Sequence, residues 1–173
     1  MHALAKYIGE DSINHALKHF LEKYGFTGPP YPTTYDLLTC LRACTPDSMQ
    51  YFLTDCFQNI TMYDNKVKNA TDTLLNGKYQ VDMTLDCNKY YADSVGKETL
   101  APMNDFVDVG IFKEKGKVLQ MNRIRLKNGE NKLHFTVDEK PYKVMIDPHY
   151  LLIDKKPDDN EYRFGVVRDK VGL

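Results

Sequence analysis

The spacing of the apolar residues changes near Tyr63, and this change divides the chain. Before Tyr63, apolar side chains recur every three or four positions, which places them on one face of an α-helix. After it they recur at every second position, as in a β-strand with one buried face. The sequence therefore predicts a helical segment at 1–63, a strand-rich domain at 64–160 and a loose tail at 161–173.

The helical segment begins with two stretches of helical spacing. Residues 1–8 show this spacing from the first position with no cap before them, as in a helix entered partway. A second helix is predicted from Ile13, with Asp11 or Ser12 as its cap. Gly25 is expected to end it in the left-handed region.

Residues 27–32, Thr-Gly-Pro-Pro-Tyr-Pro, predict a rigid connector, because proline lacks a donor and restricts the residue before it. Thr33 and Asp36 form a Thr-x-x-Asp pattern, which predicts a capped helix. Residues 45–47, Thr-Pro-Asp, predict the start of a last helix. Its apolar stripe comprises Met49, Phe52, Leu53, Cys56, Phe57 and Ile60. Three or four short helices bury only a small apolar core by themselves. We therefore expect them to pack against another part of a protein.

The remainder of the chain predicts a series of short strands. Asn76-Gly77 is a strong hairpin signal that joins a strand at 67–73 to one at 79–87. Further strands are predicted at 106–112, 118–126, 133–137, 142–146 and 151–153. Short strands with turn signals between them and no intervening helix favour an antiparallel sandwich. The predicted fold class is α+β, an N-terminal helical segment followed by an immunoglobulin-like β-sandwich.

Charge and hydropathy narrow the classes of partner. The chain has 23 Lys and Arg residues against 24 Asp and Glu residues, so no overall field attracts nucleic acid or an anionic membrane. No stretch approaches the roughly 20 apolar residues of a membrane span, so we expect no direct membrane contact by this chain. The cysteines are too few for a disulfide scaffold and form no Cys-x-x-Cys pair, so we interpret them as buried thiols. They are Cys40, Cys44, Cys56 and Cys87.

Two patterns resemble metal sites incompletely. His15 and His19 have the helical spacing by which two imidazoles bind one zinc ion, but Ala16 stands where a zinc peptidase has its glutamate. Both histidines fall opposite the apolar face, so we expect surface histidines and no metal site. Asp147, Asp154, Asp158, Asp159 and Asn160 form an acidic cluster without the spacing of a calcium loop, and we expect a solvated loop there.

The sequence gives only weak indications of a catalytic site or a recognition site. A nucleophilic hydrolase requires a base beside its cysteine or serine, and no cysteine or serine here has such a base next to it in sequence. A base that is distant in sequence remains an alternative. Tyr90 and Tyr91 could belong to an interaction surface, but half-buried tyrosines on a strand are the simpler interpretation. We therefore assign no catalytic, cofactor-binding or metal-binding residue.

Several short blocks resemble a known family. Residues 1–11 (MHALAKYIGED), 16–24 (ALKHFLEKY) and 35–38 (YDLL) resemble the end of the catalytic domain in gluzincin aminopeptidases, the family related to leukotriene hydrolase and aminopeptidase N. A second group of blocks is similar to the C-terminal region of bacterial members, especially Bacteroidetes proteins in which an aminopeptidase-like part is joined to an ABC-transporter-type permease. These blocks are residues 46–48, 60–67, 97–99, 137–141, 146–148 and 152–154.

The resemblance implies a non-catalytic C-terminal region of a larger bacterial, membrane-associated protein. The zinc ligands, the general-base glutamate and the transition-state tyrosine of the family would all lie upstream, so the chain is expected not to be an enzyme and to hold no cofactor. Its expected partner is the upstream peptidase-like domain, and a homodimer through exposed helical faces is a further expectation. The alternative is a self-contained β-sandwich that binds a protein or peptide.

Overall fold

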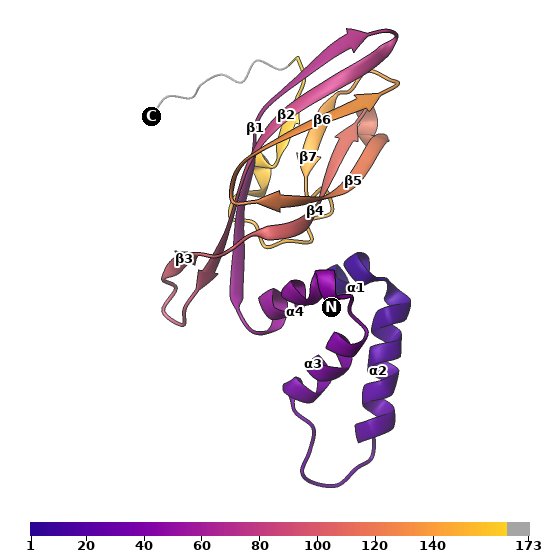
Figure 1. Ribbon diagram of the computed structural model, residues 1–173, viewed down its shortest axis with the longest axis vertical. Coiled ribbons are helices and arrows are strands. Elements are labelled where there is room, and N and C mark those ends of the chain that lie inside the picture. The colour runs from indigo at the N-terminus through magenta and orange to yellow at the C-terminus, as the bar shows by residue number, and fades with distance from the viewer. Residues whose placement is uncertain (166–173) are drawn as a thin grey trace. The chain divides into compact units, whose positions relative to one another are not determined.

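The computed structural model describes residues 1–165 and divides the chain into two compact units. The first, Met1–Thr61, contains the helices and is called the helical unit here. The second begins at Met62, contains nearly all of the strand residues and is called the sheet unit. Helices followed by antiparallel sheets confirm the α+β class (Figure 1). No helix among the described residues is long and apolar enough to cross a membrane.

The helical unit is formed by α1 (His2–Ile8), α2 (Glu10–Tyr24), α3 (Thr34–Ala43), the 3-10 turn η1 (Asp47–Met49) and α4 (Gln50–Phe57). α2 packs against α3 (Figure 1). Its buried apolar side chains include Leu4, Ile13, Leu38, Leu41, Phe52 and Leu53. The rings of Tyr7 and Phe52 lie 4.7 Å apart between centroids and join α1 to α4.

The cap of α3 is as predicted, whereas the ends of α2 are not. The Thr33 side chain accepts from the backbone of Asp36, and the Asp36 carboxylate accepts from the Thr33 N–H at 2.8 Å. α2 begins earlier than Ile13, after Gly9 turns the chain at φ 92°. Gly25 is extended at φ −63°, so the left-handed end was wrongly predicted. A Cβ on Gly25 would lie 2.4 Å from the Leu21 carbonyl oxygen, which explains the glycine.

The last helix is shorter than its apolar stripe predicts. α4 ends at Phe57, where the N–H groups of Gln58 and Asn59 both donate to the Thr54 carbonyl. Ile60 already begins the first strand and is exposed. The predicted helical stripe is therefore wrong beyond Phe57, and the strands start before the predicted position at residue 64.

The sheet unit contains two four-stranded sheets in the described part of the chain. The first has the order β1-β2-β3, with β6 also paired to β2, and the second has the order β5-β4-β7-β8. The first sheet is built from β1 (Ile60–Leu75), β2 (Lys78–Ala92), β3 (Glu98–Leu100) and β6 (Gly129–Val137). The second is built from β4 (Asn104–Phe112), β5 (Val118–Lys127), β7 (Lys143–Ile146) and β8 (Glu161–Arg163).

The two sheets share one hydrophobic core. β2 alternates as predicted, because Val81, Met83, Leu85 and Cys87 are buried while the residues between them are not. These side chains belong to the same cluster as Val107, Val109 and Ile111 of β4 and Val144 and Ile146 of β7. The predicted hairpin is also confirmed, because Asn76 and Gly77 both have positive φ, at 50° and 78°, as a type I′ turn requires.

Three predictions for the end of the chain need correction or lie outside the structure. Residues 151–153 form no strand, because the segment meets β1 only in an isolated bridge between Tyr63 and Asp154. β8 falls inside the predicted loose tail, yet it pairs with β7 through three residues from Glu161 to Arg163. The rest of that predicted tail, residues 166–173, lies outside the described residues.

Candidate functional site

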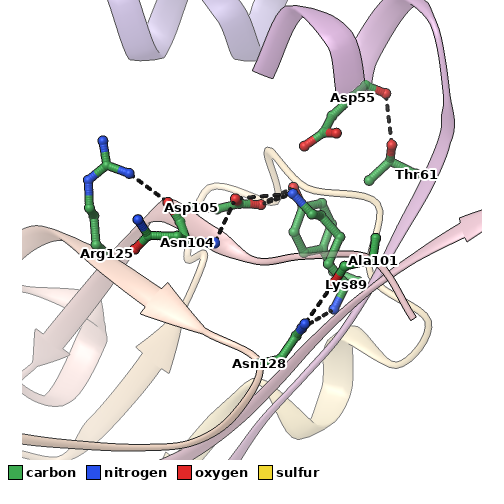
Figure 2. Close-up of polar contacts among 9 residues, drawn as sticks. Asp55, Thr61, Lys89, Ala101, Asn104, Asp105, Arg125 and Asn128 are labelled. Atoms are coloured by element: carbon green, nitrogen blue, oxygen red, sulfur yellow. Dashed lines mark hydrogen bonds and ion pairs between the residues drawn. The ribbon is translucent and has the colours of Figure 1, made fainter. Parts of the chain in front are cut away.

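The sheet unit buries an ion pair beside its apolar core. The ammonium group of Lys89 lies 2.9 Å and 3.1 Å from the two carboxylate oxygens of Asp105 (Figure 2). The two side chains expose only 3% and 5% of their surfaces. The hydroxyl of Tyr63 donates to the same carboxylate at 3.0 Å. Asp105 thus accepts from three groups, since the N–H of Asn104 also donates to it at 3.2 Å.

The strand pattern explains why these side chains meet. Lys89 takes the next inward position of β2 after Leu85 and Cys87, so it points toward the interior and not toward solvent. Asp105 is the first buried residue of β4, in the other sheet. Tyr63 lies on β1. The contact therefore joins two strands of the first sheet to one of the second.

Asn128 fixes the backbone beside the ion pair. Its Oδ1 accepts from the N–H of Lys89 at 3.0 Å, and its Nδ2 donates to the carbonyl of Ala101 at 2.7 Å (Figure 2). The N–H of Ala101 in turn donates to the Lys89 carbonyl at 2.8 Å. Asn128 is the residue at which the chain passes from β5 to β6, and hence from one sheet to the other. We call Tyr63, Lys89, Asp105 and Asn128 the buried cluster.

Arg125 contacts Asn104 at the solvent-exposed side of the site. Its guanidinium donates to the Asn104 carbonyl at 2.7 Å (Figure 2). It also stacks over the ring of Phe106, 4.2 Å from the centroid. The backbone of Asn104, next to Asp105, is therefore bound at its carbonyl by Arg125 and at its N–H by the Asp105 carboxylate. Arg125 is the exposed boundary of the site, whereas Lys89 and Asp105 are its buried centre.

The buried cluster is suited to structural cross-linking. An ammonium ion paired with a carboxylate has no free lone pair with which to attack a substrate, and the carboxylate oxygens are already bound by donors. Buried charges that are paired and hydrogen-bonded specify one arrangement of strands, because separating them leaves an uncompensated charge. The cluster therefore links β1 and β2 of the first sheet to β4 of the second.

The acidic cluster is partly buried, which corrects the predicted solvated loop. Asp147 exposes 3% of its surface and accepts from the N–H groups of Leu151 and Leu152 at 3.0 Å and 2.8 Å. Desolvation raises the pKa of Asp147 above its ordinary value, and Asp108 and Asp154 add to this. Asp154 accepts from the N–H of Asn65 and of Lys156.

The remaining acidic residues lie at the end of the same loop. Asp158 is exposed, and Asp159 lies 3.8 Å from the Lys66 ammonium group. Desolvation raises the pKa of Asp159, and this Lys66 neighbour opposes the rise. Asn160 is buried at 2% exposure. Within residues 1–165 no three His, Cys, Asp or Glu side chains are placed to hold a metal ion.

The histidines and cysteines of the helical unit differ in part from expectation. His15 and His19 are exposed, as predicted. Cys40 is buried, but Cys44 is half-buried and Cys56 is exposed, so the uniform interpretation as buried thiols was wrong. The structure also brings together two residues that are distant in sequence, because His15 Nδ1 lies 3.4 Å from Cys44 Sγ.

The two tyrosines near the end of β2 agree with their interpretation as half-buried residues of a strand. Tyr90 and Tyr91 are both half-buried. The ammonium group of Lys155 lies 3.8 Å from the centroid of the Tyr90 ring, and that of Lys89 lies 5.9 Å from the centroid of Tyr91. Each ring is thus in contact with a cation of the sheet unit.

Sequence reasoning did not identify the buried cluster. One signal was present, since Lys89 continues the inward positions of the β2 alternation and a lysine there requires an anionic partner. Nothing in the sequence pointed to Asp105 as that partner, because the pairing depends on how two sheets face each other.

Comparisons with known proteins give no further indication. No family model matches the chain, and no curated protein matches it significantly.

Proposed function

We propose that this chain is the non-catalytic C-terminal region of a larger zinc-aminopeptidase-like protein that is associated with a membrane. In this proposal the helical unit is the end of the peptidase domain. The sheet unit is an immunoglobulin-like sandwich that packs against that domain or shapes access to it. The zinc site belongs to the upstream domain, so no residue of this chain is assigned a catalytic role.

The observation that supports this proposal is the apolar surface of the helical unit. Leu21 on α2 exposes 64% of its surface and Tyr35 on α3 exposes 74%. Phe26 and Tyr31, in the connector between these helices, are exposed as well. Burying a side chain of this size is favourable by about 1.5 to 3 kcal/mol, so four of them favour a further packed neighbour. A peptidase domain that precedes the helices in sequence would provide it.

The proposal is tested by the genomic DNA upstream of the Met1 codon. We expect an in-frame His-Glu-x-x-His followed by a downstream glutamate, with apolar spans before it. A stop codon and a ribosome-binding site directly before Met1 would contradict the proposal. The upstream reading frame decides between these outcomes, because in the family that the chain resembles all catalytic residues precede the corresponding region.

A second candidate function is that of a peptide-binding sandwich, and the outer edge of β1 favours it. β1 is an edge strand of its sheet, and it contacts the 153–159 segment near its start, at Tyr63, Asn65 and Lys66. Near the hairpin turn it exposes Leu74 and Leu75, at 60% and 55%. An exposed strand edge with apolar side chains can accept an added strand from another chain.

This candidate is tested by selecting peptides from a library against the whole chain. If β1 is the binding edge, the double variant Leu74→Lys and Leu75→Lys should abolish capture of the selected peptides. Val95→Lys is the matched control, because Val95 is exposed at 86% outside β1. Equal capture by both variants would exclude the β1 edge as the binding surface.

A further inference from the structure

Cys44 lies at a fixed point of the helical unit. It follows the last residue of α3, and its N–H donates to the Leu41 carbonyl at 3.2 Å. The side-chain amide of Gln50 donates to the carbonyls on either side, those of Arg42 at 2.9 Å and Thr45 at 2.8 Å. The backbone that carries the Cys44 sulfur is therefore held by α4.

The same packing brings a base to this sulfur. His15 is on α2, which packs against α3, and its Nδ1 lies 3.4 Å from Cys44 Sγ. In the tautomer with its proton on Nε2, Nδ1 accepts the thiol proton. A cysteine and a histidine in hydrogen-bond contact form the arrangement by which thiols are activated, since the imidazolium that results stabilises the thiolate.

Among residues 1–165 the other three cysteines have no such contact with a histidine. Cys40 and Cys87 expose 4% and 0% of their surfaces, so reagents in solution do not reach them in the folded protein. Cys56 is exposed, but desolvation raises its pKa to about 11. A raised pKa lowers the fraction of reactive thiolate at Cys56. Cys44 is half-buried, and its sulfur lies within hydrogen-bond distance of a histidine ring nitrogen.

We propose that Cys44 is the reactive thiol of this chain, activated by His15, and that its reaction partner is a small-molecule disulfide. The proton of Cys44 passes to His15 Nδ1, and the thiolate attacks one sulfur of the disulfide. A Cys44 mixed disulfide forms as the sulfur–sulfur bond of the reagent breaks. The leaving thiolate takes up the proton, so no further oxidant is consumed.

The charged groups around His15 provide a control for this assignment. His15 lines a surface hollow together with Lys18, His19 and Glu22, all on α2. The guanidinium of Arg42, on α3, donates hydrogen bonds to the side chains of Gln50, Thr54 and Gln58. His19 is therefore a second exposed imidazole of the same helix, one turn from His15, and any general effect of a nearby histidine would act through it too.

The test is brief alkylation of the folded whole chain with iodoacetamide at neutral pH, with the rate measured at each cysteine by peptide mass spectrometry. We expect Cys44 to react at least about tenfold faster than Cys56, because His15 accepts the Cys44 proton and Cys56 has no such contact in the described part of the chain. His15→Gln should lower the Cys44 rate toward that of Cys56, whereas His19→Gln should leave it unchanged. Far-UV circular dichroism verifies that both variants stay helical.

The disulfide step is tested with glutathione disulfide in place of iodoacetamide. One glutathionyl group should appear on Cys44, more slowly in His15→Gln, and none should appear in Cys44→Ser. Three results would overturn the proposal: Cys56 reacts as fast as Cys44, His15→Gln leaves the Cys44 rate unchanged, or glutathione disulfide modifies another cysteine first.

Discussion

Lys89 and Asp105 show how a single charged side chain can determine the stability of the sheet unit. The variant Lys89→Met removes the cation and leaves the Asp105 carboxylate buried, with the Tyr63 hydroxyl and the Asn104 N–H as its donors among the described residues. Loss of one partner of a buried pair costs about 3 to 5 kcal/mol. We expect the free energy of unfolding, measured in urea, to fall by this amount.

The control for this prediction is Lys78→Met. Lys78 pairs with Asp138 at 3.0 Å, but the two side chains expose 59% and 81% of their surfaces. An exposed pair contributes about 0 to 1 kcal/mol, so this variant should unfold almost like the parent chain. Equal losses in Lys89→Met and Lys78→Met would show that the burial of Lys89 has no energetic consequence.

The raised pKa of Asp147 predicts that the stability of the sheet unit depends on pH. This pKa is raised chiefly by desolvation, so the folded protein holds the Asp147 proton more tightly than the unfolded chain does. The resulting stabilisation is fully present below the ordinary value of 3.8 and is lost as the pH rises through the raised pKa. The stability of the parent chain relative to Asp147→Asn should therefore increase as the pH is lowered from neutral toward 4.

Urea unfolding of both chains at several pH values in this range tests the sign. The matched variant is Asp138→Asn, because the Asp138 side chain is 81% exposed. Its difference from the parent chain should change less with pH. A parent chain that loses stability relative to Asp147→Asn on acidification would show that the folded state favours the charged Asp147.

At the scale of elements, the β1–β2 hairpin depends on the conformation of its turn. Gly77 has φ of 78°, and a Cβ added there would meet no atom within 4 Å. The cost of Gly77→Ala is therefore conformational, about 1 to 2 kcal/mol for a non-glycine residue in the left-handed region. We expect a lower melting temperature and faster hydrogen exchange in the N–H groups of β1 and β2 beside the turn.

Gly28→Ala is the control for the hairpin. Gly28 also has open space around it but does not have positive φ. Replacing a glycine at such a position leaves the stability unchanged or raises it slightly, since it restricts the unfolded chain. A Gly77→Ala chain as stable as the Gly28→Ala chain would mean that the hairpin does not require positive φ at residue 77.

The elements that could be predicted from the sequence are those whose cause is local. The Asn76-Gly77 turn and the Thr33 capping box depend on residues adjacent in sequence, and both are present. β3 and β8 were not predicted, since each has three residues and is defined by pairing with a distant strand. Ile60 was assigned to a helix because its spacing fits one, but the chain has already turned at Gln58 and Asn59.

The same distinction applies to the candidate sites. The exposure of His15 and His19 follows from their place on one helix and could be predicted. The contact of His15 with Cys44 depends on the packing of α2 against α3, and that of Lys89 with Asp105 depends on two facing sheets. These residues are separated by 29 and 16 positions, so no local pattern links them.

At the scale of the molecule, each unit has an apolar core of its own. The cluster of the sheet unit contains only residues from Tyr63 onward, while Leu53, on α4 of the helical unit, is fully buried and is not part of that cluster. Truncating a buried leucine to alanine costs about 2 to 5 kcal/mol, and the loss acts on the core to which the side chain belongs. Leu53→Ala should therefore speed hydrogen exchange in α1 to α4, and Leu85→Ala should speed it in β2 and β4.

Hydrogen exchange measured by mass spectrometry on the whole chain distinguishes the two cores in one experiment. Leu53 and Leu85 are both at 0% exposure, so each variant is the control for the other. The expected result is a reciprocal pattern, in which the faster peptides of one variant are the unchanged peptides of the other. Uniform acceleration in both would mean that the chain unfolds as one cooperative body, and the division near Thr61 would then be a boundary of geometry alone.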